Sequence, residues 1–500
     1  MSIALAAPHA EAVAAGERAV ARGGNALDAA LAAAIMLTVV YPHQCAIGGD
    51  LIALVRAPSG ETTAVIGAGT APAAIEKVSS AWSSMPRQGA HSVTVPGMLG
   101  GWSAIAGLGA RHGLDAALRD AAGIARGGVV VSAGLARAID SRADAILDDP
   151  GLRGVFAPQG VVFGEGDSYM QPALADTLDR LAVDPTAFYE GDVARAMAAA
   201  LREAGGVHAD EDFAGFRAEL LPALTTRAGG RSWSVAPPPS AAALIPAVVA
   251  AGIDGDGRAD DELLVAAAVR GVAARSAHLG DPRSSAVDLE ALLDLTGTAR
   301  ESAIRESAAS GDTASVVATD DDGWSVTIVQ SVYFTFGAGL LDPATGVLFH
   351  NRGGAFSLEK GSPALLGPGA RPPHTLCPLI VEDEENLVIA GCQGGRAQPW
   401  ILSQLFADHA ALAAPLAETL ARPRWIVGDV DLGYDRLTLA AEPGVPAAVL
   451  HAAETQSIPS ADLPALADVA GHVQLARRTP SGLEAASDPR ADGRGIVIPV

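Results

Sequence analysis

The sequence predicts a large protein of the α+β class, because helix-rich and strand-rich stretches are segregated along its 500 residues. Helical patterns dominate residues 10–40 and again residues 99–223. A strand-rich region begins at Thr313. Because 49% of the residues are hydrophobic, the chain can bury a sizeable core, and its length allows two or three domains or one large intertwined domain.

The first helical stretch is predicted to form two helices between Ala10 and Val40. Gly23-Gly24 interrupts the alanine-rich pattern, and Asn25 is a natural N-cap for the second helix. The apolar run from Ala29 to Val40 is only about half to two-thirds of the roughly 20 residues that a membrane span needs. It therefore predicts a buried helix.

Two strands are expected after the glycine-rich turn in "YPHQCAIGGDLIALVRAPSGETTAVI" (41–66). They cover Leu51 to Arg56 and Thr62 to Ile66, and Pro58-Ser59-Gly60 joins them. A further strand is expected from Asn386 to Ala390, and "GGRAQPWILSQLFADHAALA" (394–413) predicts a glycine-rich turn that opens a helix.

The segment from Ile253 to Thr313 is charged and helix-prone, with Gly-Asp breaks. It leads into "TASVVATDDDGWSVTIVQSVYF" (313–334), which predicts a β-hairpin with a DDDG turn. The three aspartates favour a solvated turn over a metal site, because aspartate is a turn-forming residue. Gly311-Asp312 before the hairpin suggests a turn that feeds the first strand.

Composition narrows the classes of partner. The formal net charge of -23 and a pI near 4.8 argue against a nucleic-acid partner, so small or uncharged substrates fit better. The sequence has three scattered cysteines, Cys45, Cys377 and Cys392, whose spacing fits neither a disulfide framework nor a zinc site. We expect them to be core residues, and a reducing compartment is the simpler interpretation. The first residues lack an export-signal pattern, so we expect a cytoplasmic protein with no membrane partner. We expect no metal or other cofactor, because the sequence has no ligand cluster with metal spacing and no nucleotide-binding motif.

Three glycine-rich turns are candidate binding elements: "AIGGD" (46–50), "NRGGAF" (351–356) and "GCQGGRAQ" (391–398). The last precedes a helical pattern, so its N–H groups could bind an anion or oxyanion. No P-loop, Rossmann fingerprint or G-x-S-x-G elbow is present. His43 beside Cys45 has no third ligand in view, which favours a structural role.

Thr313 has two interpretations. The ordinary one is the first residue of a strand. The other is an N-terminal nucleophile that cleavage exposes, because a terminal threonine carries an α-amine with a pKa near 8 that can take the hydroxyl proton.

The order of six motifs supports the second interpretation. They are "GGNALDAALAAAIMLTVVYPHQCAIGGDLIALV" (23–55), "SVTVPGMLGGW" (92–102), "GDTASVVATDDDGWSVTIVQS" (311–331), "FGAGLLDPATGVLFHNRGGAFSL" (336–358), "RPPHTLCPLIV" (371–381) and "GCQGGRAQP" (391–399). In this order they resemble the γ-glutamyltranspeptidase family, with the weakest similarity from about 105 to 310. The resemblance implies an N-terminal nucleophile hydrolase with a four-layer αββα sandwich, made as one precursor that cuts itself.

The resemblance also implies roles for individual residues. Thr313 matches the nucleophile, so cleavage of the Asp312–Thr313 bond would give subunits 1–312 and 313–500. Ser331 matches a second threonine whose hydroxyl touches the nucleophile, and Gly394 and Gly395 match the glycine pair of the oxyanion hole.

The chemistry of these residues suits that scheme. The Thr313 hydroxyl would attack the Asp312 carbonyl, with Gly311 supplying backbone freedom. In turnover it would attack a substrate amide, and water or an acceptor amine would release the acyl group. Two subunits from one precursor are therefore expected, with a homodimer of the processed heterodimer as a further arrangement.

Several expected substrate contacts are missing. The family's arginine for the donor carboxylate is absent, because Ala68 or Gly69 stands at the matching position. Gly354 replaces an acidic residue that holds the donor amine, and Tyr333 replaces an asparagine. A γ-glutamyl head group would leave its charges unpaired here.

Other side chains could still bind a carboxylate. His374 and Thr375 match a pair of serines that help to bind it. Arg352 could hold a carboxylate with its guanidinium, or it could form an inter-strand salt bridge.

The leading hypothesis is an autoprocessing amidohydrolase or acyltransferase acting on a small carboxylated amide. Within the family, the alternatives are a conventional γ-glutamyltransferase or glutathione hydrolase, an oxamate amidohydrolase and a glutaryl-type acylase. A non-enzymatic hypothesis is an unprocessed relative that only binds a ligand. It is kept because Ala314 replaces a hydroxyl residue that often follows the nucleophile.

Overall fold

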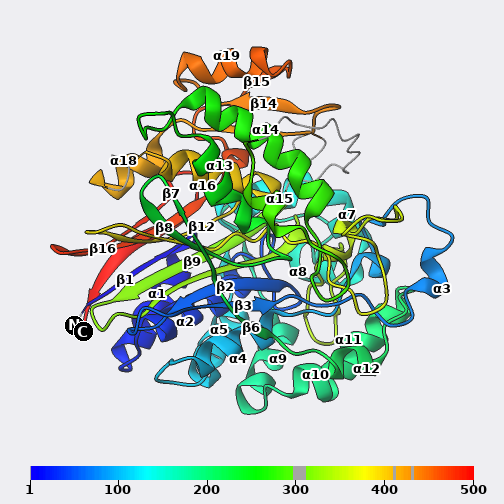
Figure 1. Ribbon diagram of the computed structural model, residues 1–500. Coiled ribbons are helices and arrows are strands. Elements are labelled where there is room, and N and C mark those ends of the chain that lie inside the picture. The colour runs from blue at the N-terminus through cyan, green and yellow to red at the C-terminus, as the bar shows by residue number, and fades with distance from the viewer. Residues whose placement is uncertain (1, 297–310, 409–412, 430–432) are drawn as a thin grey trace.

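Two β-sheets lie face to face, and helices cover the outer face of each (Figure 1). The computed structural model describes residues 2–296, 311–408, 413–429 and 433–500. The seven-stranded sheet has the order β18 (Arg494–Pro499), β1 (Ser2–Ala7), β9 (Gly311–Asp320), β10 (Ser325–Phe334), β2 (Asp50–Arg56), β3 (Thr62–Gly67) and β6 (Glu219–Pro222). The six-stranded sheet has the order β17 (Gly482–Ser487), β16 (Val473–Thr479), β12 (Leu387–Cys392), β11 (Leu379–Glu382), β8 (Arg231–Val235) and β7 (Leu224–Ala228). The expected four-layer αββα sandwich is confirmed.

The helices divide between the two outer layers. Against the seven-stranded sheet lie α1 (Ala10–Ala21), α2 (Ala26–Val40) and α4 (Met98–Gly107), and α5 (Asp115–Gly127) packs on α2. Against the six-stranded sheet lie α13 (Leu244–Ala251) and α16 (Gln398–Phe406), and α14 (Asp261–His278) packs on α13.

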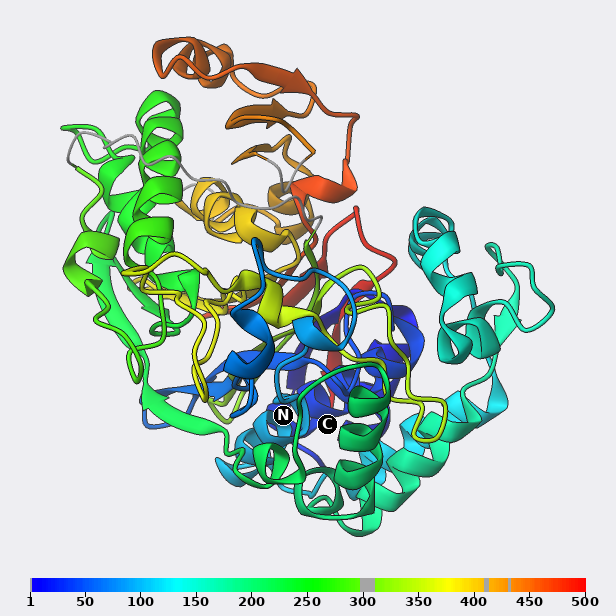
Figure 2. The same ribbon diagram turned by 90° about the vertical axis from the view of Figure 1, so that its right-hand side faces the viewer.

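The remaining helices lie at several places around the molecule (Figure 2). They are α3 (Glu76–Ser79), α6 (Ala133–Ser141), α7 (Ala143–Asp148), α8 (Pro150–Phe156), α9 (Pro172–Val183), α10 (Ala187–Glu190), α11 (Asp192–Glu203), α12 (Asp210–Ala214), α15 (Leu289–Leu293), α18 (Leu416–Ala421) and α19 (Ala447–Thr455). A small sheet combines β13 (Trp425–Gly428), β14 (Thr438–Ala441) and β15 (Ser460–Asp462), and β4 (Val129–Val130) pairs with β5 (Ser168–Tyr169).

The two helices predicted between Ala10 and Val40 are confirmed. Asn25 caps α2 through its side chain, which accepts from the N–H of Leu27 at 3.0 Å, and Asp28 returns a bond to the Asn25 N–H at 2.9 Å. This reciprocal capping satisfies donors that the first turn of a helix leaves unpaired. All residues of α2 are buried, as its apolar composition predicts.

The period-2 alternation of the strands builds two separate cores. Val317 of β9 and Ile52 of β2 lie in the apolar cluster between the sheets. Their neighbours Val316 and Ala318, and Ala53 in β2, point to the helices instead. Because successive strand residues point to opposite faces, one strand can serve both layers only if both faces are apolar. This explains the continuous hydrophobic run from Leu51 to Val55 in β2.

The predicted hairpin is formed by β9 and β10, but two local details differ from the sequence-based expectation. Asp321 and Asp322 are exposed, whereas Asp320 is fully buried and accepts from the N–H groups of Ala26 at 3.1 Å and Trp324 at 2.9 Å. The interpretation of all three aspartates as solvated was therefore wrong for Asp320. Its carboxylate is needed to satisfy buried backbone donors.

The second difference concerns the residues before the nucleophile candidate. Strand β9 begins at Gly311, so Asp312 lies in a strand and not in a turn. The positive φ in this region belongs to Tyr333 on the partner strand, with φ 78°.

Other boundaries are close to the predictions. The strands expected at 51–56, 62–66 and 386–390 are β2, β3 and β12, and the three cysteines are buried. Strand β6 lies at the end of the stretch expected to be helical. The charged segment 253–313 forms α14 and α15, while residues 297–310 lie outside the described part of the chain.

The two ends of the chain meet in the seven-stranded sheet. Strand β1 pairs with β18, placing Ser2 opposite Pro499, and with β9 on its other side. Figures 1 and 2 both place the N- and C-terminal labels side by side. Within the described residues, no helix combines the length and the apolar character that crossing a bilayer requires.

Candidate active site

A β-bulge lies at the Asp312–Thr313 peptide bond. Gln330 pairs with Ala314, but the next registered pair is Tyr333 with Asp312, so β10 carries an extra residue opposite Thr313. A bulge re-aims side chains. Here the Ser331 hydroxyl donates to the Asp312 carbonyl oxygen at 2.5 Å and accepts from the Tyr333 N–H at 2.7 Å. The carbonyl of this peptide bond is thus hydrogen-bonded to a side chain instead of a ladder partner.

Thr313 is enclosed by the residues that follow the glycine pair. It is 1% exposed, and its hydroxyl accepts from Gln398 Nε2 at 3.5 Å. Gln398 is the first residue of α16, and its side-chain oxygen is fixed by the Cys377 N–H at 3.0 Å. The helix that follows the glycine-rich turn therefore delivers a side chain directly to the threonine hydroxyl.

Gly394 and Gly395 form a turn that other residues would strain. Their φ angles are 145° and 51°, and a Cβ on Gly394 would lie 2.6 Å from Ile401 Cδ1. Among the described residues, neither N–H group donates to a partner. Adjacent backbone N–H groups in such a turn can bind a developing oxyanion.

Asp312 places a carboxyl group in the same buried region. Its side chain accepts from the Thr335 hydroxyl, and the residue is 5% exposed. Burial raises the pKa of Asp312 to about 7, because the charged form loses its hydration, while the Thr335 contact acts in the opposite direction.

A cavity of about 960 Å³ has Tyr333 in its wall, whereas Thr313 is not among its lining residues. Its lining is rich in positive charge, with Arg87, Arg275, Arg352 and Arg396. Tyr333 connects the two regions: its N–H bonds to Ser331, and its hydroxyl accepts from Arg396 Nη2 at 3.4 Å. Such a cavity favours an anionic ligand.

Arg352 is the most buried of these cations, with 1% exposure. Its guanidinium lies 3.8 Å from the centre of the Tyr333 ring, and Nη2 donates to Thr375 Oγ1 at 3.4 Å. Nη1 is buried and has no hydrogen-bond partner among the described residues. Burial lowers the pKa of Arg352 to about 10, so the group remains charged at neutral pH. In the described chain Arg352 forms no salt bridge, which leaves the carboxylate interpretation as the one the geometry favours.

His374 lies behind Arg352 and faces Asp50. Its Nε2 is 3.5 Å from Asp50 Oδ2, and His350 Nδ1 lies 3.3 Å from the same oxygen. Burial and the charge of Arg352 hold the pKa of His374 well below its usual range, so the imidazole is neutral. Of the two residues expected to replace the family's serines, Thr375 contacts Arg352, whereas His374 is directed toward the buried Asp50.

Of the positions of the missing γ-glutamyl contacts, Gly69 is closed by packing, whereas Gly354 lines the cavity and is only tightly spaced. A Cβ on Gly69 would lie 1.5 Å from the Val95 carbonyl oxygen, and Ala68 is buried in the apolar cluster between the sheets. A Cβ on Gly354 would lie 3.3 Å from the Pro86 carbonyl oxygen. The backbone at Gly69 thus has no room for an arginine side chain.

Sequence reasoning missed Gln398, Asp50 and three of the four arginines. Gln398 and Arg396 stand in the "GCQGGRAQ" motif, so their proximity to the glycine pair was available as a signal. Arg87 and Arg275 come from distant segments with no local pattern, and only the tertiary structure brings them to the cavity.

The four-layer αββα sandwich is the fold of the N-terminal nucleophile hydrolases. The family model described as Gamma-glutamyltranspeptidase matches residues 12–498, and the chain therefore belongs to the γ-glutamyltranspeptidase family.

Its relatives cover several activities. The oxamate amidohydrolase proenzyme of Klebsiella pneumoniae is 32% identical, over 94% of both chains. The acylase ACY 1 proenzyme of a Pseudomonas species is 29% identical over 98% of this chain and 92% of its own. The solved cephalosporin acylase of Bacillus halodurans superposes with a TM-score of 0.86 at 27% identity, covering 99% of this chain and 95% of its own. The protein is an enzyme of the amidohydrolase and acylase type.

Proposed function

We propose that the chain cuts itself between Asp312 and Thr313 and then hydrolyses amides whose acyl group carries a carboxylate. Its two subunits would be 1–312 and 313–500. The observation that carries the substrate class is Arg352, a buried cation with an unpaired Nη1 in the wall of a cationic cavity. An unpaired buried donor is costly unless a ligand group completes it.

Self-cleavage uses the contacts at the bulge. The Thr313 hydroxyl adds to the Asp312 carbonyl carbon, and Ser331 donates to the oxygen that becomes negative. The C–N bond then breaks, the nitrogen takes a proton to become the amine of Thr313, and an ester joins Asp312 to the threonine oxygen. Water hydrolyses this ester, leaving a carboxylate on Asp312 and a free threonine hydroxyl.

Turnover repeats this chemistry on a substrate. The free α-amine takes the Thr313 hydroxyl proton, and the oxygen attacks the substrate carbonyl. Gly394 and Gly395 supply N–H groups to the oxyanion, and Gln398 orients the attacking hydroxyl. The C–N bond then breaks, the leaving nitrogen takes the proton from the α-ammonium and departs as an amine toward the cavity, and water hydrolyses the acyl-enzyme. Arg352 and Thr375 hold the carboxylate of the acyl group through both steps.

The size of the cavity supports a longer substrate over a short one. Oxamate has few atoms, whereas about 960 Å³ is near the upper end of the usual range for ligand pockets. We therefore favour a carboxyacyl group, such as glutaryl, attached to a larger amine. Oxamate is the second candidate, and the Klebsiella oxamate amidohydrolase relative supports it.

A conventional glutathione hydrolase is less well supported. Ala68 is buried, and Gly69 and Gly354 are packed against backbone oxygens, so partners for both charges of a γ-glutamyl head group are absent at these positions. Each lost charge-assisted hydrogen bond is worth roughly 1.5–3 kcal/mol, so two should cost about two to four orders of magnitude in kcat/KM. Membership of the family argues against a non-enzymatic binding protein, despite Ala314.

The test compares kcat/KM of the processed protein on glutaryl-p-nitroanilide, oxamate, glutathione and acetyl-p-nitroanilide. We expect a preference for the carboxylated amides. Arg352→Ala should reduce kcat/KM on glutaryl-p-nitroanilide by roughly ten- to a hundredfold and leave acetyl-p-nitroanilide, which has no carboxylate, nearly unchanged. Arg217→Ala, at an exposed arginine paired with Glu190, is the matched control. Efficient turnover of glutathione, or an equal loss on both anilides, would contradict the proposal.

A further inference from the structure

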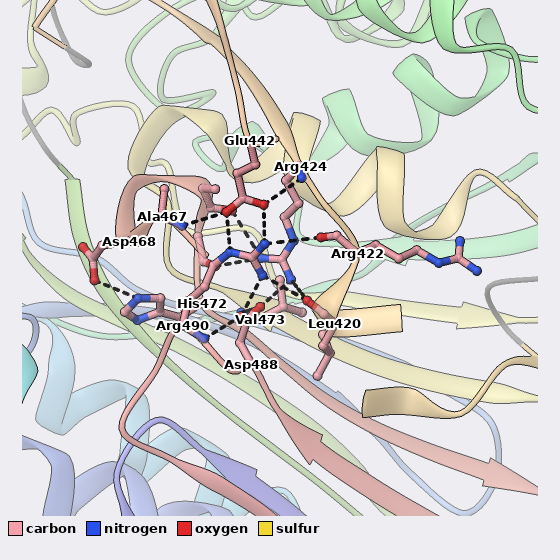
Figure 3. A network of polar contacts seen from close by, with 12 residues as sticks. Leu420, Arg422, Arg424, Glu442, Ala467, Asp468, His472, Val473, Asp488 and Arg490 are labelled. Atoms are coloured by element: carbon pink, nitrogen blue, oxygen red, sulfur yellow. Dashed lines mark hydrogen bonds and ion pairs between the residues drawn. The ribbon is translucent and has the colours of Figure 1, made fainter. Parts of the chain in front are cut away.

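Four charged side chains form a buried cluster next to the small β13–β14–β15 sheet (Figure 3). We call Arg424, Glu442, Asp488 and Arg490 the ion cluster. Arg424 pairs with Asp488, Arg490 Nη1 donates to Asp488 Oδ1 at 3.1 Å, and Arg490 Nε donates to Glu442 Oε1 at 2.9 Å. The signs alternate, so every buried charge has an opposite neighbour. Removing one member would leave a buried charge unpaired.

The ion cluster also binds the main chain of residues 467–473. Glu442 Oε1 accepts from the Ala467 N–H at 2.7 Å, and Asp488 Oδ2 accepts from the Val473 N–H at 3.0 Å. Arg424 Nη1 donates to the Gly471 carbonyl at 2.7 Å. The segment is thus held at both ends, Ala467 and Val473, as Figure 3 shows, and also at Gly471.

A side-chain pair closes this segment on itself. His472 Nε2 lies 2.9 Å from Asp468 Oδ1, and both residues are drawn in Figure 3. With its ends, its middle and its own side chains fixed, the segment 467–473 is a rigid support for whatever packs against it.

Gln393 packs against that support and directly precedes the glycine pair. Its N–H donates to the His472 carbonyl at 2.9 Å, and its side-chain Oε1 accepts from the His472 N–H at 3.2 Å. Gly471 fits tightly here, because a Cβ at that position would lie 2.7 Å from the Gln393 carbonyl oxygen. Gln393 is 3% exposed. Two hydrogen bonds and a close backbone contact therefore tie the start of the turn to residues 471–472.

We propose that Gln393 is a positioning residue for catalysis: it fastens the Gly394-Gly395 turn to the segment 467–473 and, through it, to the ion cluster. This inference rests on the proposed role of the two glycines. Donors to an oxyanion stabilise the transition state only when they are held in place before the reaction, and small displacements are costly. Among the contacts between the turn and residues 471–472, the one made by the Gln393 side chain can be removed by a single substitution.

The rate of self-cleavage can distinguish this role from a general effect on the stability of the fold. The Asp312 carbonyl accepts from Ser331, which makes the donor for self-cleavage a side chain of β10 and not the glycine turn. A displaced turn should therefore slow turnover and leave self-cleavage intact. A general loss of structure would slow both reactions.

The experiment uses Gln393→Met, which keeps the length of the side chain and removes the acceptor. We expect self-cleavage at a rate within about twofold of wild type, kcat on glutaryl-p-nitroanilide and on oxamate lower by roughly tenfold, and KM within about threefold. Gln393→Glu keeps an oxygen for the His472 N–H and should lose less kcat than the methionine variant. If Gln393→Met does not fold, Gln393→Glu allows the same comparison of self-cleavage with turnover.

Gln404→Met is the matched control. Gln404 also accepts from a backbone N–H, that of Trp425, at 3.1 Å, but it lies farther along α16. The Gln404→Met variant should have a lower Tm than wild type and an unchanged kcat. Unchanged kcat in Gln393→Met, or an equal slowing of cleavage and turnover, would overturn the inference. Failure of the proposed function would instead appear in the wild-type protein, as an uncut chain or as no release of amine or ammonia.

Discussion

Thr313 and Asp312 occupy an unusual environment for a bond that is proposed to break. Both residues are nearly inaccessible, and the bond between them lies within a hydrogen-bonded strand. Each group that could assist cleavage is nevertheless in contact with it: Ser331 on the carbonyl oxygen, Gln398 on the threonine hydroxyl and Thr335 on the Asp312 carboxyl. The burial that protects the bond from proteases also fixes these contacts, which favours an intramolecular reaction.

Replacing the nucleophile gives the most direct prediction. Thr313→Ala should remain a single chain without activity, because no hydroxyl is left to attack the Asp312 carbonyl. Thr313→Ser should cut slowly, because it keeps a hydroxyl at the same reach. Denaturing electrophoresis and N-terminal sequencing of the smaller band measure both outcomes. A Thr313→Ala protein with the normal two bands would reject the assignment.

The carboxyl group of Asp312 predicts a pH dependence of the uncut chain. Its pKa is raised from 3.8 to about 7 in the fold, mainly by burial. The folded state therefore keeps a proton that the unfolded chain loses, so stability falls as the pH rises from about 4 to about 7 and then levels off. The full loss is up to about 4 kcal/mol.

Thermal unfolding can isolate this contribution in the uncut Thr313→Ala background. Adding Asp312→Asn should reduce the fall in Tm between pH 5 and pH 8, because the amide does not titrate. Other titrating groups are common to both proteins and cancel in the comparison. Identical pH profiles for the two variants would show that Asp312 is not the buried acid proposed.

At the scale of elements, the bulge between β9 and β10 positions the side chain that contacts the Asp312 carbonyl. A regular antiparallel ladder would occupy the Asp312 carbonyl with a backbone N–H. The extra residue in β10 instead brings the Ser331 hydroxyl to that oxygen, and Tyr333 accommodates the distortion with its positive φ. The strained residue also forms the wall of the cavity and supports Arg352. One irregularity therefore links the cleavage site to the proposed substrate site.

Ser331→Ala tests this arrangement. Loss of one preorganised donor to an oxyanion typically costs 10²–10³ in rate, so self-cleavage should slow by about two orders of magnitude. Ser331→Thr keeps the hydroxyl and should cut at a rate nearer to wild type. Ser325→Ala, which removes another buried β10 hydroxyl bonded to Thr319 at 2.8 Å, is the control. Time courses of band formation measure all three, and equal rates in Ser331→Ala and Ser325→Ala would contradict the role.

At the scale of the whole molecule, the two proposed subunits are interleaved and do not form separate domains. Strand β1 from the large part lies between β9 and β18 from the small part. In the other sheet, β8 of the large part pairs with β11 of the small part. Cutting the chain before Thr313 leaves all these ladders in place.

The processed protein should therefore behave as one unit. We expect residues 1–312 and 313–500 to co-elute from a sizing column under native conditions and to separate only in denaturant, because each sheet would lose pairing along whole strands. A purified 313–500 fragment should not fold alone, which circular dichroism can measure. Dissociation of the two parts in dilute native buffer would contradict this prediction. The homodimer of the processed heterodimer stays a prediction that the same column tests.

Local sequence patterns predicted much of the fold and of the proposed reaction centre. The Asn25 cap, the β9–β10 hairpin and the order of the six motifs depend on residues close together in the chain, so the sequence alone determined the family, the sandwich and the candidates Thr313, Ser331, Gly394 and Gly395. The burial of Asp312, the cavity that joins Arg87 and Arg275 to Arg352, and the support of Gln393 by residues 467–473 depend on segments far apart in sequence. Burial and charge pairing are properties of the assembled layers, and only the tertiary structure decided them.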